Sequence, residues 1–206
     1  MQNLIERVPL DVFMPFIMAG CPDLPESMAQ AYIRQTCVDF CQRSGWLRRT
    51  SHIDQQLDVC DYPVWLDACE QIVRINEVHI DHTSYRGGRD SCCFDHCGAR
   101  FTVRDGMLHM SDKPQRDKQH AIKVRFISAP TRDACEVDAT LHHDWQEAIE
   151  DGALAKIYLL PGYRFTSPQL SIVRGKSFSE HVGRARIRAL RSETGDATIA
   201  RAESFV

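Results

Sequence analysis

The hydrophobic pattern of this chain changes its period twice, from helical to strand-like and back to helical. Between residues 23 and 44, apolar residues recur at the spacing of one face of an α-helix. They then mostly alternate with polar residues, as in half-buried antiparallel strands, before the helical period returns. This order predicts an α+β fold in which helices from both chain ends pack together around an inserted antiparallel β-module. The predicted helical module comprises residues 1–45 and 142–206, and the β-module residues 46–141.

Short local signals predict where the first helix begins and ends. Asp23 and Glu26 have the spacing of a capping box, and Pro25 suits a first helical turn. Gly45 can adopt the left-handed conformation that ends many helices. Before this helix, Pro15 makes a long regular helix unfavourable. We therefore expect one main helix in this half of the helical module.

The clearest strand signal is the sequence FTVRDGMLHM at residues 101–110. Its Asp-Gly dipeptide favours a two-residue hairpin turn, which pairs Val103 with Leu108 and Phe101 with Met110. Alternation predicts further strands over residues 73–80, 122–126 and 135–141. The first of these is interrupted at Asn76-Glu77, which indicates a bulge or turn.

Two helices are expected after the β-module. The first contains Trp145 and Ile157 and ends before Pro161-Gly162; the second starts at Ser167-Pro168 and extends to about Arg191. The second helix has one regular apolar stripe, formed by Phe178, Val182, Ala185 and Ala189. Leu170 and Val173 fall on a different side, which predicts either a bend at Gly175 or contacts with two partners.

Composition narrows the class of protein. Of the 206 residues, 43% are hydrophobic, which supports a buried core, and the formal charge of −3 does not indicate a general polyanion binder. The nine cysteines are an odd number, which argues against a disulfide framework and favours a reducing compartment such as a bacterial cytoplasm. We expect neither a signal peptide nor a membrane-spanning segment.

Little in the sequence predicts catalysis. The densest group of metal-ligand types, Cys92, Cys93, His96 and Cys97, has no second ligand pair after it, so we interpret it as a cysteine-tolerant loop. No local signature joins Cys92 or Cys93 to His142 or His143 as a nucleophile and base. Gly87-Gly88 has no phosphate-loop pattern. We predict no enzyme activity, catalytic residue, cofactor or metal.

A basic stretch near the end of the chain is more informative. Arg184, Arg188 and Arg191 lie on one stripe of the predicted helix, with Glu180 as the single acid between residues 174 and 191. Such a stripe can face solvent, an acidic protein surface or DNA phosphates. These three interpretations remain open on the residues alone.

Two stretches at the ends of the chain share features with a known protein family. In residues 15–49, a Gly-Cys-Pro turn leads into a helix that closes with Phe, Cys and Arg before a Trp. In residues 144–189, an acidic residue and Gly-Ala-Leu precede a proline turn and a second helix with a basic close. Together the two stretches cover about 80 of the 206 residues. The matched residues are Gly20, Cys21, Pro22, Ala31, Phe40, Cys41, Arg43, Trp46, Trp145, Ile149, Asp151, Gly152, Ala153, Leu154, Pro161, Pro168, Leu170, Phe178, Ala185, Phe205 and Val206.

In these features the chain resembles the head-to-tail adaptor (connector) proteins of tailed bacteriophages. The resemblance implies a structural virion protein of the neck, assembled in the host bacterial cytoplasm, that forms a ring of usually twelve copies between the portal protein and the tail tube or nozzle protein. Genomic DNA would pass through the channel without sequence-specific recognition. The C-terminal segment would contact the portal. The cysteine-rich loop departs from the family pattern.

The expected interface with other subunits combines the apolar stripe, the basic stripe and the C-terminal residues. Two alternatives remain: a DNA-binding or regulatory protein that uses the basic helix, and a thiol-dependent or zinc enzyme. The predicted interface residues are Phe178, Val182, Arg184, Ala185, Arg188, Arg191, Phe205 and Val206.

Overall fold

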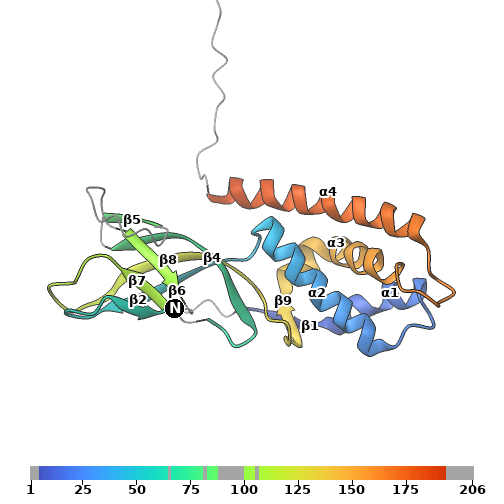
Figure 1. The fold of residues 1–206 in the computed structure, drawn as a ribbon, viewed down its shortest axis with the longest axis horizontal. Helices are drawn as coiled ribbons and strands as arrows, with labels where there is room; N and C mark the ends of the chain where they lie inside the picture. Colours follow the sequence, from blue (N-terminus) through green and yellow to red (C-terminus); the bar gives the residue numbers. More distant parts are fainter. Residues whose placement is uncertain (1–4, 65, 81–82, 88–99, 105–106, 194–206) are drawn as a thin grey trace, which may run out of the picture.

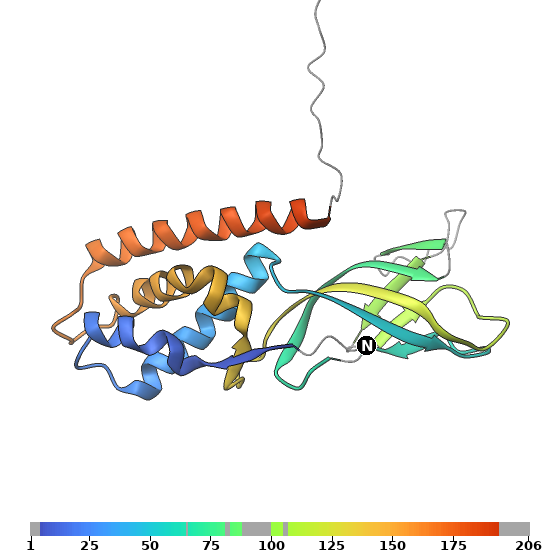
Figure 2. The ribbon, with the colours of Figure 1, turned by 180° about the vertical axis from the view of Figure 1, so that it is seen from behind.

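The helices gather at one end of the molecule and a large sheet forms the other end, as the computed structural model shows (Figure 1; Figure 2). The α+β class predicted from the sequence is therefore confirmed. In the described part of the chain, no helix has the length and apolar content needed to span a bilayer. The structure describes residues 5–64, 66–80, 83–87, 100–104 and 107–193.

The helical end is built from segments far apart in the sequence, as its core shows. Phe13, Phe40, Leu141 and Ile149 are all fully buried in one hydrophobic cluster, which also contains Val182 of the last helix. The helices are η1 (Leu10–Phe13), α1 (Met14–Gly20), α2 (Glu26–Ser44), α3 (Ala139–Ile157) and α4 (Pro168–Glu193).

The helix limits follow the sequence signals in part. Gly45 has a φ of 64° and its N–H donates to the Cys41 carbonyl, which confirms the predicted end of α2. The predicted capping box is absent, because α2 begins at Glu26 and its N-cap, Pro25, has no side-chain hydrogen bond. No bend is visible in α4 (Figure 1), whereas α3 is kinked at Trp145, whose φ is −135°.

The predicted strand over residues 135–141 is correct only in its first half. Residues 136–138 form the short strand β9 (Glu136–Asp138), which pairs with β1 (Arg7–Pro9) under the helices. Asp138 then caps α3, because its Oδ1 accepts a hydrogen bond of 2.9 Å from the Thr140 N–H. A helix therefore starts before the alternating pattern ends.

The other end is a seven-stranded sheet in the order β2-β8-β4-β5-β6-β7-β3. The predicted hairpin register is confirmed, since Phe101 pairs with Met110 and Val103 with Leu108. The interruption expected at Asn76-Glu77 matches a register shift between Ile75 and Glu77. The strands are β2 (Arg48–Gln55), β3 (Asp61–Pro63), β4 (Glu70–Ile80), β5 (Thr83–Gly87), β6 (Arg100–Arg104), β7 (Met107–Met110) and β8 (Lys118–Pro130).

A buried ion network joins the sheet to the helical end. The Arg49 guanidinium of β2 lies 2.6 Å from Glu70 Oε1 on β4 and 2.6 Å from Asp138 Oδ2 at the start of α3. Burial disfavours the charge on Arg49, but its hydrogen bonds to both carboxylates outweigh this and raise its pKa. Strand β8 also spans both ends, since Ala129 packs in the helical core and Val124 in the sheet core.

Candidate protein interface on the last helix

The inner side of α4 is part of the intramolecular core. Phe178 is only 6% exposed, and its ring centroid lies 6.4 Å from that of Phe40 on α2. Gly152 of α3 allows this close approach, because an added Cβ would lie 2.7 Å from Phe178 Cδ2 and 2.5 Å from Thr36 Cγ2. Three residues of the predicted interface therefore need correction: helices of the same chain already cover Phe178, Val182 and Ala185.

The outer side of α4 exposes a second set of apolar side chains. Ile172 is 73% exposed near the start of the helix, and Ile187 is 53% exposed near its end. Of the nine exposed large hydrophobic side chains in the described residues, five lie on this one helix. They form two groups, at the start and at the end of the helix, roughly 20 Å apart along its axis, with Lys176 and Glu180 between them. Groups of exposed apolar side chains mark interaction sites, whereas single exposed apolar residues are ordinary. We call these five the outer apolar face: Leu170, Ile172, Val173, Ile187 and Leu190.

A glycine lies on the same side of the helix. An added Cβ at Gly183 would meet no atom within 4 Å, so packing inside the chain does not require glycine there. Glycine in an exposed helix interior costs about 1 kcal/mol relative to alanine. Gly183 precedes Ile187 by four residues and so lies one turn away on the same face. The outer apolar face is thus flat at this point, which would allow another backbone to approach closely.

The arginines beside this face are partly engaged within the chain. Arg174 Nη1 lies 2.5 Å from Asp151 Oδ1, and Arg188 Nη1 lies 3.4 Å from Asp144 Oδ1. The Arg188 guanidinium also lies over the Trp46 ring, 5.3 Å from its centroid. Arg184 is exposed, and its Nη2 lies 3.4 Å from the His181 ring nitrogens. Because Arg174 and Arg188 already have carboxylate partners, fewer charges are available to phosphates than the sequence indicates.

The remaining residues predicted for the interface, and the residues considered for metal binding or catalysis, lie in different parts of the chain. Arg191 is exposed at the end of α4, whereas Phe205 and Val206 lie outside the described residues. The cluster from Cys92 to Cys97 and Gly88 also lie outside them. His142 packs edge-on against Phe13 at a centroid distance of 5.7 Å, which is an ordinary core contact.

The described cysteines of α2 have no feature of reactive thiols. Burial raises the pKa of Cys37 to about 12, and it raises the pKa of Cys41 well above its ordinary value. Both side chains are fully buried in the helical core. Among the described residues, no three His, Cys, Asp or Glu side chains are grouped so that they could hold a metal ion.

No known family model matches this sequence, and no curated protein matches it either. Function must therefore be inferred from the surface of the molecule itself. Sequence reasoning placed Leu170 and Val173 on a separate side of the helix but did not connect them with Ile187 and Leu190. Gly183, Ile187 and Leu190 have the spacing of one face of a helix. The arginines between them led us to interpret this stretch as basic rather than apolar.

Proposed function

We propose that this protein is a structural subunit that assembles into a ring, in the role of a head-to-tail adaptor between the portal and the tail of a phage virion. The observation that carries the proposal is the outer apolar face of α4, which remains exposed although the chain has a complete helical core of its own. The sequence resemblance of both chain ends to phage adaptors supports this choice of assembly. The outer apolar face would pack against the neighbouring copy in the ring.

The energy available from this face fits assembly on a template better than a free dimer. Burying the exposed parts of five such side chains contributes roughly 5 kcal/mol, since one fully buried side chain contributes about 2 kcal/mol. Association itself costs about 4–15 kcal/mol. The face alone would hold two free subunits together only weakly. A ring seated on the portal adds a second contact for each subunit, so we expect isolated subunits to stay monomeric until the portal is present.

Ile187→Asp is expected to abolish ring formation on the portal while leaving the monomer folded. The substitution places a charge where the neighbouring subunit would pack, yet the Ile187 side chain is 53% exposed and contributes little to the monomer core. Native mass spectrometry of subunit and portal mixtures measures the rings, and thermal unfolding measures the monomer.

Leu57→Asp is the matched control, because Leu57 is 51% exposed but lies on the sheet end, away from α4. This variant should form rings like the wild type. Rings of normal size and yield with Ile187→Asp would refute the proposed interface.

Gly183→Ala is expected to act in opposite directions on the monomer and on the ring. The added methyl group meets no atom of the chain, so helix propensity should raise the free energy of unfolding by about 0.5–1 kcal/mol. The same methyl would separate two helices that pack closely at this position, so the fraction of subunits in rings should fall. Chemical denaturation and native mass spectrometry give the two quantities. A variant that is stabilised and assembles normally would show that no backbone approaches Gly183.

Nucleic-acid binding is the second candidate, favoured by the exposed Lys176, Arg184 and Arg186 on α4. It requires an affinity of the isolated chain for duplex DNA that falls steeply with salt concentration. A ring-forming adaptor requires no such affinity in its free subunit. Titration of DNA at two salt concentrations therefore separates the two functions.

A further inference from the structure

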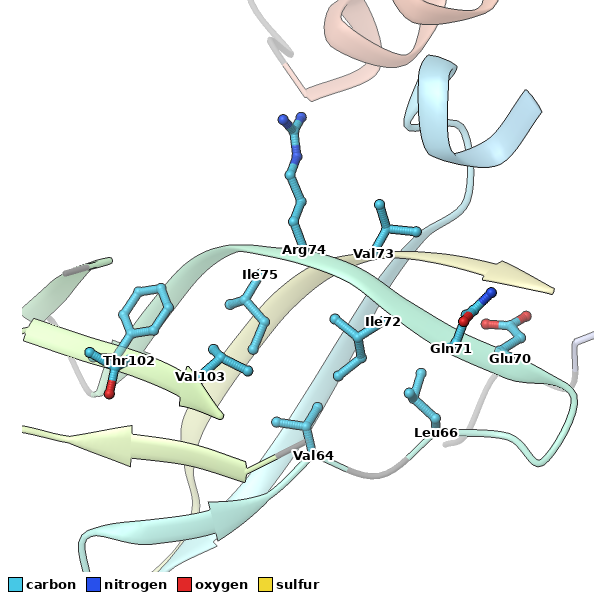
Figure 3. A pocket seen from close by; sticks show the side chains of 11 residues that line it. Val64, Leu66, Glu70, Gln71, Ile72, Val73, Arg74, Ile75, Thr102 and Val103 are labelled. Carbon is cyan, nitrogen blue, oxygen red and sulfur yellow. The ribbon is translucent and has the colours of Figure 1, made fainter. Parts of the chain in front are cut away.

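Seven of the nine large hydrophobic side chains that are exposed in the described residues lie on the helical end. The other two lie on the sheet end, where Val103 lines a pocket beside β4 (Figure 3) and Leu57 lies between β2 and β3. Five of the seven form the outer apolar face of α4. The remaining two, Phe16 and Leu159, come from other elements of the helical end.

Contacts place these two residues beside the start of α4. The Arg174 guanidinium lies 5.6 Å from the centroid of the Phe16 ring on α1, and Leu170 precedes Arg174 by one helical turn. The Ser167 N–H donates over 2.9 Å to the carbonyl of the residue before Leu159. The exposed apolar surface at the start of α4 therefore continues onto α1 and the loop after α3. We call it the distal apolar surface: Phe16, Leu159, Leu170 and Val173.

Helix α1 contributes an apolar side to this surface. Its sequence, MPFIMAG, contains no charged or polar side chain. A helix that is apolar on all sides is normally buried, yet only Ile17 of α1 is fully buried, and Pro15, Phe16 and Ala19 are exposed. The described part of the chain therefore leaves one apolar side of α1 uncovered.

Acidic residues lie at the same end of the molecule. The end of α1, the start of α2 and the start of α4 are all far from the sheet (Figure 1; Figure 2). Tyr163, in the loop before α4, donates to Met28 Sδ at 3.8 Å and so joins this loop to the start of α2. Asp23 and Glu26 are exposed there, and the described ion pairs include neither of them. The loop also exposes one cation, Arg164.

The second half of α4 carries the opposite charge. Arg184 and Arg186 are exposed on either side of the apolar positions Gly183 and Ile187, and the described ion pairs include neither arginine. Two copies that met through this region alone would bring their arginines together, and like charges repel. The charges therefore favour a contact between two different surfaces. Such a head-to-tail contact is also the type that generates a ring.

We propose that the distal apolar surface of one copy packs against the second half of α4 of the next copy, at Gly183, Ile187 and Leu190. Asp23 and Glu26 of the first copy would face the arginines of the second. Each copy would thus use the two groups of its outer apolar face for two different neighbours. This inference rests on the proposed ring and names the two surfaces that meet in it.

Phe16→Asp is expected to lower the yield of rings on the portal at least about tenfold, because it places a charge in the distal apolar surface. The Phe16 side chain is 46% exposed, so the monomer should unfold near the wild-type temperature. Leu159→Asp, at a side chain that is 60% exposed on a loop, should have the same effect and keeps the test valid if Phe16→Asp unfolds. Leu57→Asp again serves as the control with normal rings.

A mixture of two variants tests whether the two surfaces meet each other. Phe16→Asp keeps the second half of α4 intact, and Ile187→Asp keeps the distal apolar surface intact. One unmodified contact can therefore form between the two variants, but no third copy can join through another. Native mass spectrometry of an equimolar mixture with the portal should show an excess of bound pairs that contain one copy of each variant.

The outcomes separate this inference from the proposed ring. Normal rings with Phe16→Asp and Leu159→Asp, together with none for Ile187→Asp, would overturn the inference and leave the ring standing. Normal rings with all three variants would overturn both. Loss of rings without an excess of mixed pairs would also contradict the inference, because the distal apolar surface would then contact the portal rather than the next copy.

Discussion

Phe178→Asp is expected to unfold the helical end of the molecule, rather than only to prevent association. Phe178 is buried between α2 and α3, against Phe40 and over Gly152. Loss of a core phenylalanine alone costs about 3–5 kcal/mol. An unpaired carboxylate in the same place adds a desolvation cost, and the total approaches the roughly 5–15 kcal/mol by which domains of this kind are stable. Circular dichroism should show loss of helix at 25 °C.

Two further variants make this expectation specific. Phe178→Leu keeps an apolar side chain and should cost less than half as much in urea unfolding. Ile187→Asp carries the same charge on the opposite side of the same helix and should leave the helical signal unchanged. A folded, cooperative Phe178→Asp monomer would mean that the inner side of α4 is not part of the core.

Arg49→Met is expected to lower the free energy of unfolding by about 3–5 kcal/mol, because it removes the cation from the buried Asp138 carboxylate and leaves Glu70 with Arg7, whose Nη2 lies 3.6 Å from Glu70 Oε1. The side chains of Glu70 and Asp138 are 3% and 7% exposed, and each lies 2.6 Å from the Arg49 guanidinium. The effect should reach both ends of the molecule, since the three residues come from β2, β4 and the start of α3. Chemical denaturation followed by tryptophan fluorescence and by circular dichroism measures it.

The pH dependence of this loss of stability tests whether the unpaired carboxylate causes it. Burial tends to raise the pKa of Asp138, but hydrogen bonds from Thr140 and Arg49 outweigh it and hold the pKa below its ordinary value. The stability from this carboxylate is therefore present above the ordinary aspartate pKa of about 4 and is lost as pH falls through the lowered value. The difference in the free energy of unfolding between wild type and Arg49→Met should shrink as pH falls below about 4, because an Asp138 carboxyl group that lacks its cation is then protonated and uncharged.

Arg125→Met provides the matched control for the network. Arg125 pairs with Glu77 at 3.3 Å, but both side chains are 44% exposed. An exposed pair contributes about 0–1 kcal/mol, so this variant should remain near wild-type stability. Equal losses from Arg49→Met and Arg125→Met would indicate that burial of the network has no special effect.

The two sides of α4 differ in their burial. The inner side of α4 completes the core with Val182 and Ala185, and the outer side exposes Ile172 and Ile187. A helix that only stabilised its own chain would need the first set alone. Among the described residues, the second set is therefore the main support for the proposed partner contact, and the variants at residues 178 and 187 test the two sides independently.

The sequence by itself determined the elements whose signals are local. The Asp-Gly dipeptide at residues 105–106 predicted the pairing of Val103 with Leu108, because a two-residue turn leaves one register for the flanking residues. Gly45 ended α2 because few other residues adopt a positive φ without strain. The change of hydrophobic period similarly predicted the α+β class. A period of about 3.6 residues indicates a helix with one buried side, and a period of two indicates a strand with one buried side.

Only the tertiary structure decided which apolar side of α4 faces inward. Both sides carry large apolar residues, and the choice depends on the close packing of Phe178 against Gly152, a residue of another helix. The same holds for Arg49, whose partners lie 21 and 89 positions away in the sequence. Contacts between distant residues leave no local sequence pattern. The helix or strand propensity of a residue does not specify which distant side chain it will contact.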